Sequence, residues 1–419
     1  MSDPYPLPTE DQVNTDPYSL PLAEINVANP YLFAHDVHGK WFRRLRDEAP
    51  VHYCVDSFFG PYWSVTRYDD IMTVDTSHAV FSSEPVITIR EPFEDFPLPM
   101  FIAMDPPKHD EQRKVVAPVV GPENLKNFES IIRERTADVL EHLPLGESFN
   151  WVERVSIELT TRMLATLFDF PFEERSKLTY WSDVATAVPG LGLIESEDER
   201  KQVMLECLEY FTGLWNERVN RPGGNDLVSM LAHGEATKNM GPVEYLGNLI
   251  LLIVGGNDTT RNTMTASVLS LANNPDQFEK LVADPSLIPS MVAETIRWQT
   301  PLAHMRRTAK VDTELGGQQI RAGDKVVMWY VSGNRDERVF ERPDDFIIDR
   351  PNVRKHLAFG FGIHRCMGNR LAELQLRILW EEILKRFERI ELAGDVQRSV
   401  SVFVHGYTGL PVIAHPRRP

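Results

Sequence analysis

The segment from Phe359 to Gly368 contains a cysteine in a setting that suits a metal ligand. Cys366 lies at the end of a glycine-containing loop, and the residues from Met367 onward have the pattern of a helix. A thiolate binds a metal, and a helix N-terminus favours that anion through its unpaired N–H groups and its positive dipole end. Gly362 and Gly368 can adopt backbone angles, or allow close approaches, that other residues cannot. The segment therefore predicts a cysteine ligand on a tight turn that packs against a large flat group.

A second unusual feature is a polar group in the middle of an apolar helix. Residues 242–274 have the pattern of one helix, of about 30 residues and roughly 45 Å. Its section 249–254 is apolar on all sides, so the helix should cross the protein centre. Asp258 and Thr259 follow after two glycines. A solvated or helix-starting role does not fit this place, whereas an acid followed by a hydroxyl group offers a path for protons.

Two charged pairs lie at helical spacing elsewhere in the chain. His109 and Arg113 are four residues apart in a helix that two prolines begin, and Glu294 and Arg297 are three apart. The simplest interpretation of each pair is a solvated helix face, where an ion pair contributes only about 0.5 kcal/mol. The spacing alone does not decide between that interpretation and a role in a site.

Taken together, these segments resemble the signature motifs of the cytochrome P450 monooxygenases. The pattern Phe-x-x-Gly-x-x-x-Cys-x-Gly begins at Phe359, the acid and alcohol pair is Asp258 and Thr259, and Glu-x-x-Arg begins at Glu294. The resemblance implies a mainly α fold with minor β structure, in which a single haem-thiolate domain, residues 36–419, encloses haem b.

The resemblance also implies roles for individual residues. Cys366 would be the iron ligand, and Asp258 and Thr259 would deliver protons for catalysis. Further haem-binding residues are expected at His109, Arg113, Arg307, His364, Phe359 and Gly360. A buried, charge-assisted structural network behind the haem is expected to consist of Glu294, Arg297 and Arg350.

The loop 85–104 is rich in apolar residues and prolines and has no regular period, so it must bury apolar surface. Ordinary loop packing explains this equally well, but in the family the equivalent segment covers the substrate pocket. We expect a narrow apolar channel lined by Val86, Ile87, Leu251, Val254, Gly255, Leu302, Ala303 and Phe403. His304 should also face the pocket, as a hydrogen-bonded wall residue rather than a catalytic base.

A narrower resemblance concerns residues 252–262 and the run from 356 to 386, which are similar to the bacterial alkane and fatty-acid terminal hydroxylases. It implies insertion of one oxygen atom of O2 at the end of a medium-chain alkane or fatty acid. The alternatives are a hydroxylase of terpenes or other cyclic apolar molecules, a haem-thiolate sensor and a peroxide-driven enzyme. A sensor would have no use for Asp258 and Thr259, and the family's peroxygenases depart from that pair.

Composition limits the partners and the location. The net charge of −17 argues against nucleic acid, three cysteines leave no disulfide framework, and neither a signal peptide nor a membrane-spanning run is evident. We therefore expect a cytoplasmic protein. Residues 1–35, rich in Pro, Asp and Asn, are expected to form a surface arm.

We expect a separate protein to supply the electrons, because residues 1–419 leave no room for a flavin or nicotinamide domain. The resemblance to soluble class I bacterial members implies a [2Fe-2S] ferredoxin with a separate NAD(P)H-dependent reductase. Residues 350–377 carry six bases and one acid, an excess of five in an acidic protein. We expect an acidic ferredoxin to dock there.

Overall fold

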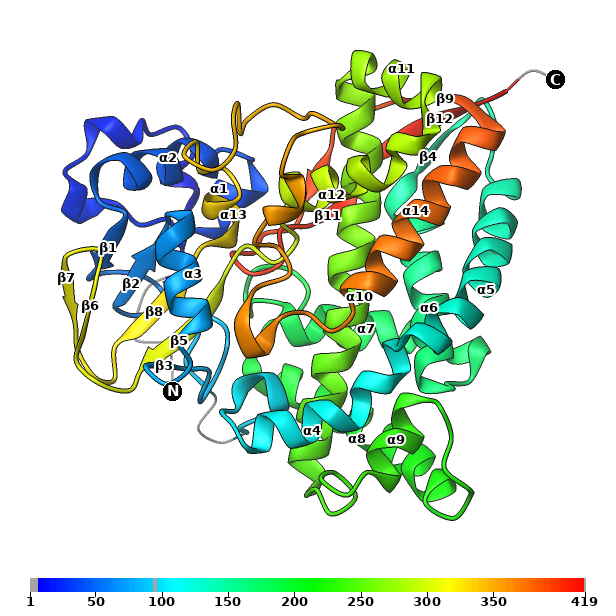
Figure 1. Ribbon diagram of the computed structural model, residues 1–419, viewed down its shortest axis with the longest axis horizontal. Coiled ribbons are helices and arrows are strands. Elements are labelled where there is room, and N and C mark those ends of the chain that lie inside the picture. The colour runs from blue at the N-terminus through cyan, green and yellow to red at the C-terminus, as the bar shows by residue number, and fades with distance from the viewer. Residues whose placement is uncertain (1–6, 93–95, 418–419) are drawn as a thin grey trace.

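The computed structural model describes residues 7–92 and 96–417. Figure 1 shows a large helical body on one side, and on the other a smaller region in which the N-terminal part of the chain and the strands near residue 320 lie together. The helices are α1 Pro30–Ala34, α2 His38–Glu48, α3 Tyr68–Thr76, α4 Lys108–Val116, α5 Pro122–Glu141, α6 Glu158–Phe168, α7 Ser176–Thr186, α8 Glu197–Arg218, α9 Leu227–His233, α10 Pro242–Asn273, α11 Pro275–Ala283, α12 Ile288–Gln299, α13 Tyr330–Gly333 and α14 Asn369–Arg386. The mainly α architecture expected from the sequence is confirmed.

The strands belong to separate small sheets. They are β1 Val51–Cys54, β2 Tyr62–Val65, β3 Phe81–Ser82, β4 Ser148–Asn150, β5 Met305–Ala309, β6 Thr313–Leu315, β7 Gln318–Ile320, β8 Lys325–Met328, β9 Phe387–Leu392, β10 Gln397–Arg398, β11 Tyr407–Gly409 and β12 Pro411–Pro416. Within the described residues, one sheet has the order β1-β2-β8-β5-β3 and another the order β4-β12-β9. Strands β1 and β2 pair antiparallel, with Val51 opposite Val65.

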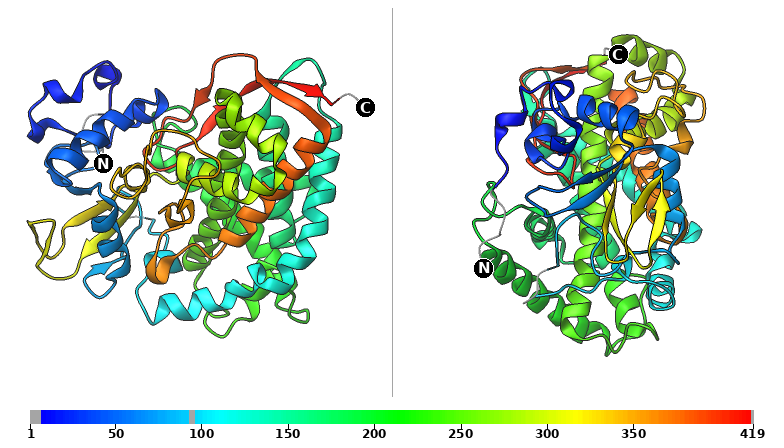
Figure 2. Two further views of the ribbon diagram at one scale, coloured as in Figure 1. Left: turned by 45° about the horizontal axis from the view of Figure 1, so that its top comes forward. Right: turned by 90° about the vertical axis from the view of Figure 1, so that its left-hand side faces the viewer.

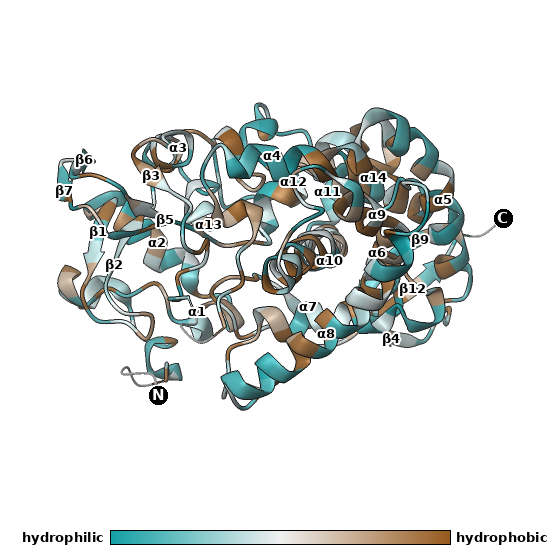
Figure 3. Cartoon of the chain, turned by 90° about the horizontal axis from the view of Figure 1, so that it is seen from below, coloured by the Kyte–Doolittle hydropathy of each residue, from teal (hydrophilic) through white to brown (hydrophobic). Residues whose placement is uncertain are grey.

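Helix α10 is the centre of the helical body. It begins at Pro242, whose missing N–H costs nothing in the first turn, and it ends before the Asn274–Pro275 pair. Figure 3 shows it end-on between the other helices, with a mainly apolar surface. It packs against α6, α7, α8, α12 and α14. The long central helix predicted from the sequence is therefore observed almost to the residue.

The N-terminal segment packs more deeply than a surface arm would. Ile25, Val27, Leu32 and Phe33 are buried in a cluster with residues of α2 and with Trp329. The apolar side chains of this segment are separated by Pro and Asn, so they show no helical or strand periodicity in the sequence. Each of them is nevertheless buried in the core. Figure 2 shows this segment in two further views, against the region that holds the five-stranded sheet.

No helix among the described residues is long and apolar enough to cross a membrane.

Candidate functional site

A cavity of about 700 Å³ lies between α10, the loop residues 85–92 and 97–104, and the loop that precedes α14. Cys366, Phe359 and Gly360 line one part of it, and Thr259 of α10 lines another. Residues of α10 form part of the cavity wall, and residues of the two loops form much of the rest. The structure thus brings the cysteine loop and the polar section of α10 to the same space.

The Cys366 loop has the tight backbone that its glycines predict. Gly360 and Gly362 have φ angles of +63° and +67°, and a Cβ at Gly362 would come within 2.7 Å of the Asp75 carbonyl oxygen. The Cys366 N–H donates to the Phe359 carbonyl oxygen at 2.8 Å, which closes the turn. Gly368 has an ordinary φ of −85° and is the N-cap of α14, so no special backbone angle is needed there.

The surroundings of the Cys366 sulfur act in both directions on its charge. The Cys366 side chain is exposed to the cavity. Protein encloses the sulfur on its other sides. Burial raises the pKa of the thiol, whereas the backbone N–H groups of Gly368 and Asn369 and the nearby charge of Arg113 lower it. The helix N-terminus thus supplies the donors that a thiolate ligand needs.

Basic side chains gather on the same side of the cavity. Arg113 and Arg307 line it, and Arg307 is only 3% exposed. Both ring nitrogens of His364 lack a hydrogen-bond partner among the described residues, and burial lowers its pKa to about 2. His109 packs on His364 with ring centroids 4.2 Å apart, and its Nε2 also lacks a partner within the described chain.

Asp75 is a buried residue of this site that sequence reasoning missed. Its Oδ1 accepts from Arg307 Nη2 at 2.8 Å, and its Oδ2 accepts from the Tyr330 hydroxyl and the Phe361 N–H, each at 2.8 Å. These contacts join α3, β5, α13 and the cysteine loop. An acid near the end of a short helix carries no sequence signal of such a role, so only the fold reveals it.

These features fit haem b, an iron porphyrin with two carboxylates on one edge. Cys366 offers a soft sulfur ligand to iron. Arg113 and Arg307 offer cationic donors to carboxylates, and the partnerless nitrogens of His364 and His109 leave buried polar atoms that such a group would satisfy. The residues present therefore match the cofactor on its metal side and on its anionic side.

Asp258 and Thr259 are neighbours on α10 but face different surroundings. The Thr259 hydroxyl donates to the Gly255 carbonyl oxygen at 2.9 Å and borders the cavity. Asp258 is fully buried and faces α7, where its Oδ1 accepts from Ser182 at 3.1 Å and lies 3.2 Å from Arg261 Nη2. Burial raises the pKa of Asp258 to about 6, against the opposing effect of Arg261.

Arg261 continues this polar group toward the surface. Its Nη2 donates to Asp183 at 2.5 Å, and the Asp183 side chain is 32% exposed. Asp258 Oδ2 has no hydrogen-bond partner in the described part of the chain. A buried carboxyl with a pKa near neutrality and one unpartnered oxygen can take up and release a proton.

The expected structural network is present as a set of contacts. The Glu294 carboxylate accepts hydrogen bonds from Arg297 Nε at 2.7 Å, Arg297 Nη2 at 2.8 Å and Arg350 Nε at 3.0 Å. Glu294 and Arg297 have no exposed surface, and Arg350 is 4% exposed. Glu294 and Arg297 have the spacing of an ordinary surface ion pair, but both side chains are buried.

The residues expected to line the apolar channel mostly border the cavity. This holds for Val86, Ile87, Leu251, Val254, Gly255, Leu302 and Phe403. Ala303 does not, because it is buried in the cluster of Val327 and Trp329. Successive side chains of an extended segment point to opposite faces, so Leu302 and Ala303 cannot both face the cavity.

His304 forms a structural link instead of part of the lining. Its Nε2 accepts from the Ile89 N–H at 3.0 Å, and its Nδ1 lies 2.9 Å from the Val402 carbonyl oxygen, to which it donates. Burial lowers its pKa to about 4, so the ring is neutral. It thereby joins the loop 85–104 to the turn that carries Phe403.

Comparisons with known proteins agree with this site. A sequence profile of the cytochrome P450 family matches residues 283–401. The chain is 36% identical to the linalool 8-monooxygenase of Pseudomonas putida, over 94% of this chain and 99% of that protein. It is 31% identical to the methyl-branched lipid omega-hydroxylase of Mycobacterium tuberculosis, over 95% of this chain and 96% of that protein. The solved structure of cytochrome P450-153 from Novosphingobium aromaticivorans is 50% identical, with a TM-score of 0.87, over 93% of this chain and 99% of that one.

Proposed function

This chain belongs to the cytochrome P450 family of haem-thiolate monooxygenases, and we propose that it hydroxylates the terminal carbon of medium-chain alkanes or fatty acids. The observation that carries the proposal is the apolar wall of the cavity, in which aliphatic side chains and Phe403 line the same space as Thr259 and Cys366. The name of one relative, a lipid omega-hydroxylase, supports the same chemistry.

Haem b supplies the activation of O2 and the oxidising power for C–H hydroxylation. Cys366 would hold it by the thiolate, and Arg113 and Arg307 would bind its carboxylates. The rigid turn at Gly360 and Gly362 would fix the position of the sulfur. The chain's own task is then to present one carbon of the substrate and to control water and protons.

Asp258 and Thr259 would divide the proton task between them. Asp258 can take up and release a proton at Oδ2, which has no hydrogen-bond partner among the described residues, while Arg261 and Asp183 hold the carboxyl on its Oδ1 side. The Thr259 hydroxyl, held by the Gly255 carbonyl oxygen, can pass a proton at Oγ1 into the cavity. The missing side chain of Gly255 leaves space beside it, since a Cβ there would meet nothing within 4 Å.

Selectivity for a chain end must come from confinement. A primary C–H bond is stronger than a secondary one, so an unrestrained substrate would react at its inner methylenes. Leu251, Val254, Leu302 and Phe403 would restrict the substrate so that its methyl group reaches the reacting position. Each buried CH2 stabilises the complex by about 0.8 kcal/mol, so affinity should rise roughly fourfold per carbon until the channel is full.

The test is a product analysis with n-octane, dodecanoic acid and a cyclic monoterpene. We expect mainly primary alcohols from the linear substrates. Leu302→Ala should move oxidation inward by one or two carbons while total turnover is kept. Leu145→Ala is the matched control, since Leu145 is 49% exposed and is not part of the cavity wall. Mainly secondary alcohols from the parent enzyme would refute the terminal-hydroxylase proposal.

A terpene hydroxylase is the second candidate, because a relative with 36% identity is named for linalool. The same assay separates the two. If the monoterpene is turned over faster than both linear substrates, this candidate replaces the first.

For electron supply we propose an acidic [2Fe-2S] ferredoxin docking on the surface around the Cys366 loop. Some basic side chains of residues 350–377 already form ion pairs within the protein. Arg350 pairs with Glu294, Arg354 lies 3.0 Å from Glu373, and Arg377 lies 3.0 Å from Glu129. The exposed bases that remain in the segment include Lys355, Arg365 and Arg370. They favour an acidic partner by long-range attraction.

Stopped-flow reduction of the holoenzyme by such a ferredoxin should slow as salt rises, because screening weakens exposed charges. Arg370→Glu should slow it several-fold more than Arg389→Glu on β9, which is also exposed. Equal effects of the two variants would place the docking surface elsewhere.

A further inference from the structure

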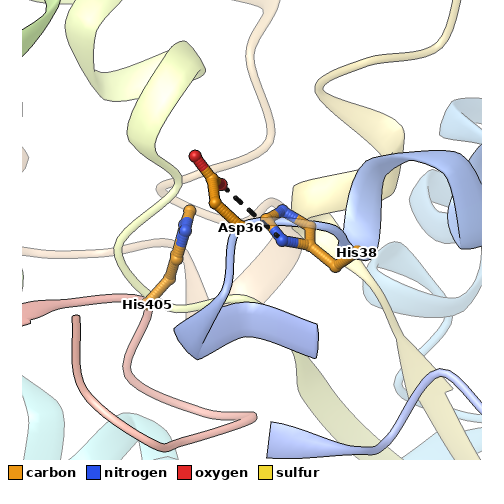
Figure 4. A group of neighbouring side chains, drawn as sticks. All are labelled: Asp36, His38 and His405. Carbon is orange, nitrogen blue, oxygen red and sulfur yellow. Dashed lines mark ion pairs between the residues drawn. The ribbon is translucent and has the colours of Figure 1, made fainter. Parts of the chain in front are cut away.

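Three side chains from distant parts of the sequence converge away from the haem site. Asp36 precedes α2, His38 is the first residue of α2, and His405 lies in the turn before β11. Figure 4 shows the carboxylate beside the two imidazole rings, whose centroids lie 5.1 Å apart. One potential ligand atom from each residue lies within 4.8 Å of the others, and Asp36 Oδ1 is 3.9 Å from His38 Nδ1.

Both histidines are buried and each has an unpartnered ring nitrogen. His38 is 8% exposed and His405 is 6% exposed. Among the described residues, His38 Nδ1 and His405 Nε2 have no hydrogen-bond partner. A buried polar atom without a partner is unusual and calls for a ligand or a bound water.

The other contacts of the group orient those free atoms. His405 Nδ1 lies 2.7 Å from the Gln299 carbonyl oxygen. A carbonyl only accepts, so Nδ1 carries the proton and Nε2 presents its lone pair. Asp36 Oδ2 accepts from Arg398 Nη2 at 2.6 Å, which leaves Oδ1 on the side of His38. Backbone carbonyls and side chains in such outer contacts are what fixes metal ligands in proteins.

We propose that Asp36, His38 and His405 form a binding site for a divalent transition-metal ion of the zinc type. Two imidazoles and one carboxylate, with water in the fourth position, are a common ligand set for such an ion. Ligand atoms about 2.0–2.1 Å from a tetrahedral metal lie about 3.4 Å from one another. The separation of 3.9 Å between Asp36 and His38 would have to close by roughly half an ångström.

Nearby cations oppose metal binding. The charges of Arg335 and Arg398 act on His38 and would repel a dication. We therefore expect weaker binding than at a cysteine-rich zinc site.

A metal ion at this site would link residues 36–38 to the turn at His405. That link would also affect the wall of the substrate pocket. The turn that holds His405 also holds Phe403, which lines the cavity. His405 N–H donates to Pro301 and the Phe403 carbonyl oxygen accepts from Ala303, both at 2.9 Å. The ion would therefore fix the turn that forms one wall of the channel.

The test is zinc binding by the tag-free holoenzyme after treatment with a chelator. Equilibrium dialysis with elemental analysis should give one zinc per chain in addition to the haem iron. His405→Gln and Asp36→Asn should each weaken that binding at least tenfold. His415→Gln is the matched control, because His415 pairs with Glu391 on the exposed strand β9 and should leave zinc binding unchanged.

Stability provides a second measurement. Zinc at 100 times the parent's dissociation constant should raise the folding equilibrium constant about 100-fold in the parent protein and in His415→Gln, but by no more than about tenfold in Asp36→Asn. The Asp36 side chain is 50% exposed, so this variant should keep its fold and its haem absorption. Absence of a saturable zinc site, or equal zinc binding by Asp36→Asn and the parent, would overturn the proposal without affecting the haem chemistry.

Discussion

Glu294→Gln is the most informative single substitution, because it removes one charge from a network that has no exposed surface at its centre. Glu294 is contacted by two arginines, and its Oε1 also accepts from the Ile347 N–H at 2.9 Å. Glutamine keeps the shape and one acceptor oxygen. It replaces the other oxygen with an NH2 group, which cannot accept from a guanidinium.

The expected loss follows from what remains buried. Arg297 and Arg350 would keep their charges inside the protein with no carboxylate to balance them. Breaking a buried ion pair by removing one partner costs about 3–5 kcal/mol, which is a change of roughly 150- to 5000-fold in the folding equilibrium. Arg297 also donates to the Asn334 and Pro343 carbonyl oxygens, so the loss should extend to that loop.

The assay is urea unfolding of the holoenzyme, followed by far-ultraviolet circular dichroism and haem absorption. Glu235→Gln is the control, because Glu235 and Lys238 have the same three-residue spacing and lie 2.7 Å apart, but Glu235 is 89% exposed. That variant should lose less than about 0.5 kcal/mol. If the two variants lost similar stability, burial would not be what gives the Glu294 network its strength.

Other predictions concern the reaction and its pH dependence. Cys366→His should keep the fold and the haem, but lose product formation and the thiolate-type band of the ferrous carbon monoxide complex. Thr259→Ala should keep oxygen consumption while product falls several-fold and hydrogen peroxide rises, whereas Asp258→Asn should slow all turnover about tenfold or more; normal rates and full coupling in both would exclude the proton path. Burial lowers the pKa of His304 to about 4, so the unfolded chain binds the extra proton between pH 6.5 and 4. His304 alone should therefore lower the free energy of unfolding by up to about 3 kcal/mol across that range, and His304→Gln should reduce the slope of pH-dependent unfolding curves.

Some features of this fold could be predicted because their cause is local. The apolar run before Gly255 specified α10, and the glycines and the cysteine specified the turn before α14. A π-helical segment, Val152–Ile157, precedes α6 and packs against α10. No local pattern in the sequence indicates its wider turn.

The site divides in the same way. Cys366 and Thr259 lie within motifs whose chemistry is visible in the sequence, and both border the cavity. Asp75 could not be predicted, because its role depends on three partners from other elements. The prediction that Ala303 lines the channel was wrong. The sequence indicates an extended segment there, but it does not indicate which side chains point to the cavity.

The Asp75 contacts also bear on the order in which the holoenzyme is assembled. The Asp75 carboxylate accepts from Arg307, Tyr330 and the Phe361 N–H, so it ties the cysteine loop to α3, β5 and α13. We predict that these contacts form before haem binds, so that loading is limited by entry of the porphyrin and not by ordering of its ligand loop. Hydrogen exchange in protein produced without haem should accordingly show a protected Phe361 amide, and Asp75→Asn should expose it and slow reconstitution.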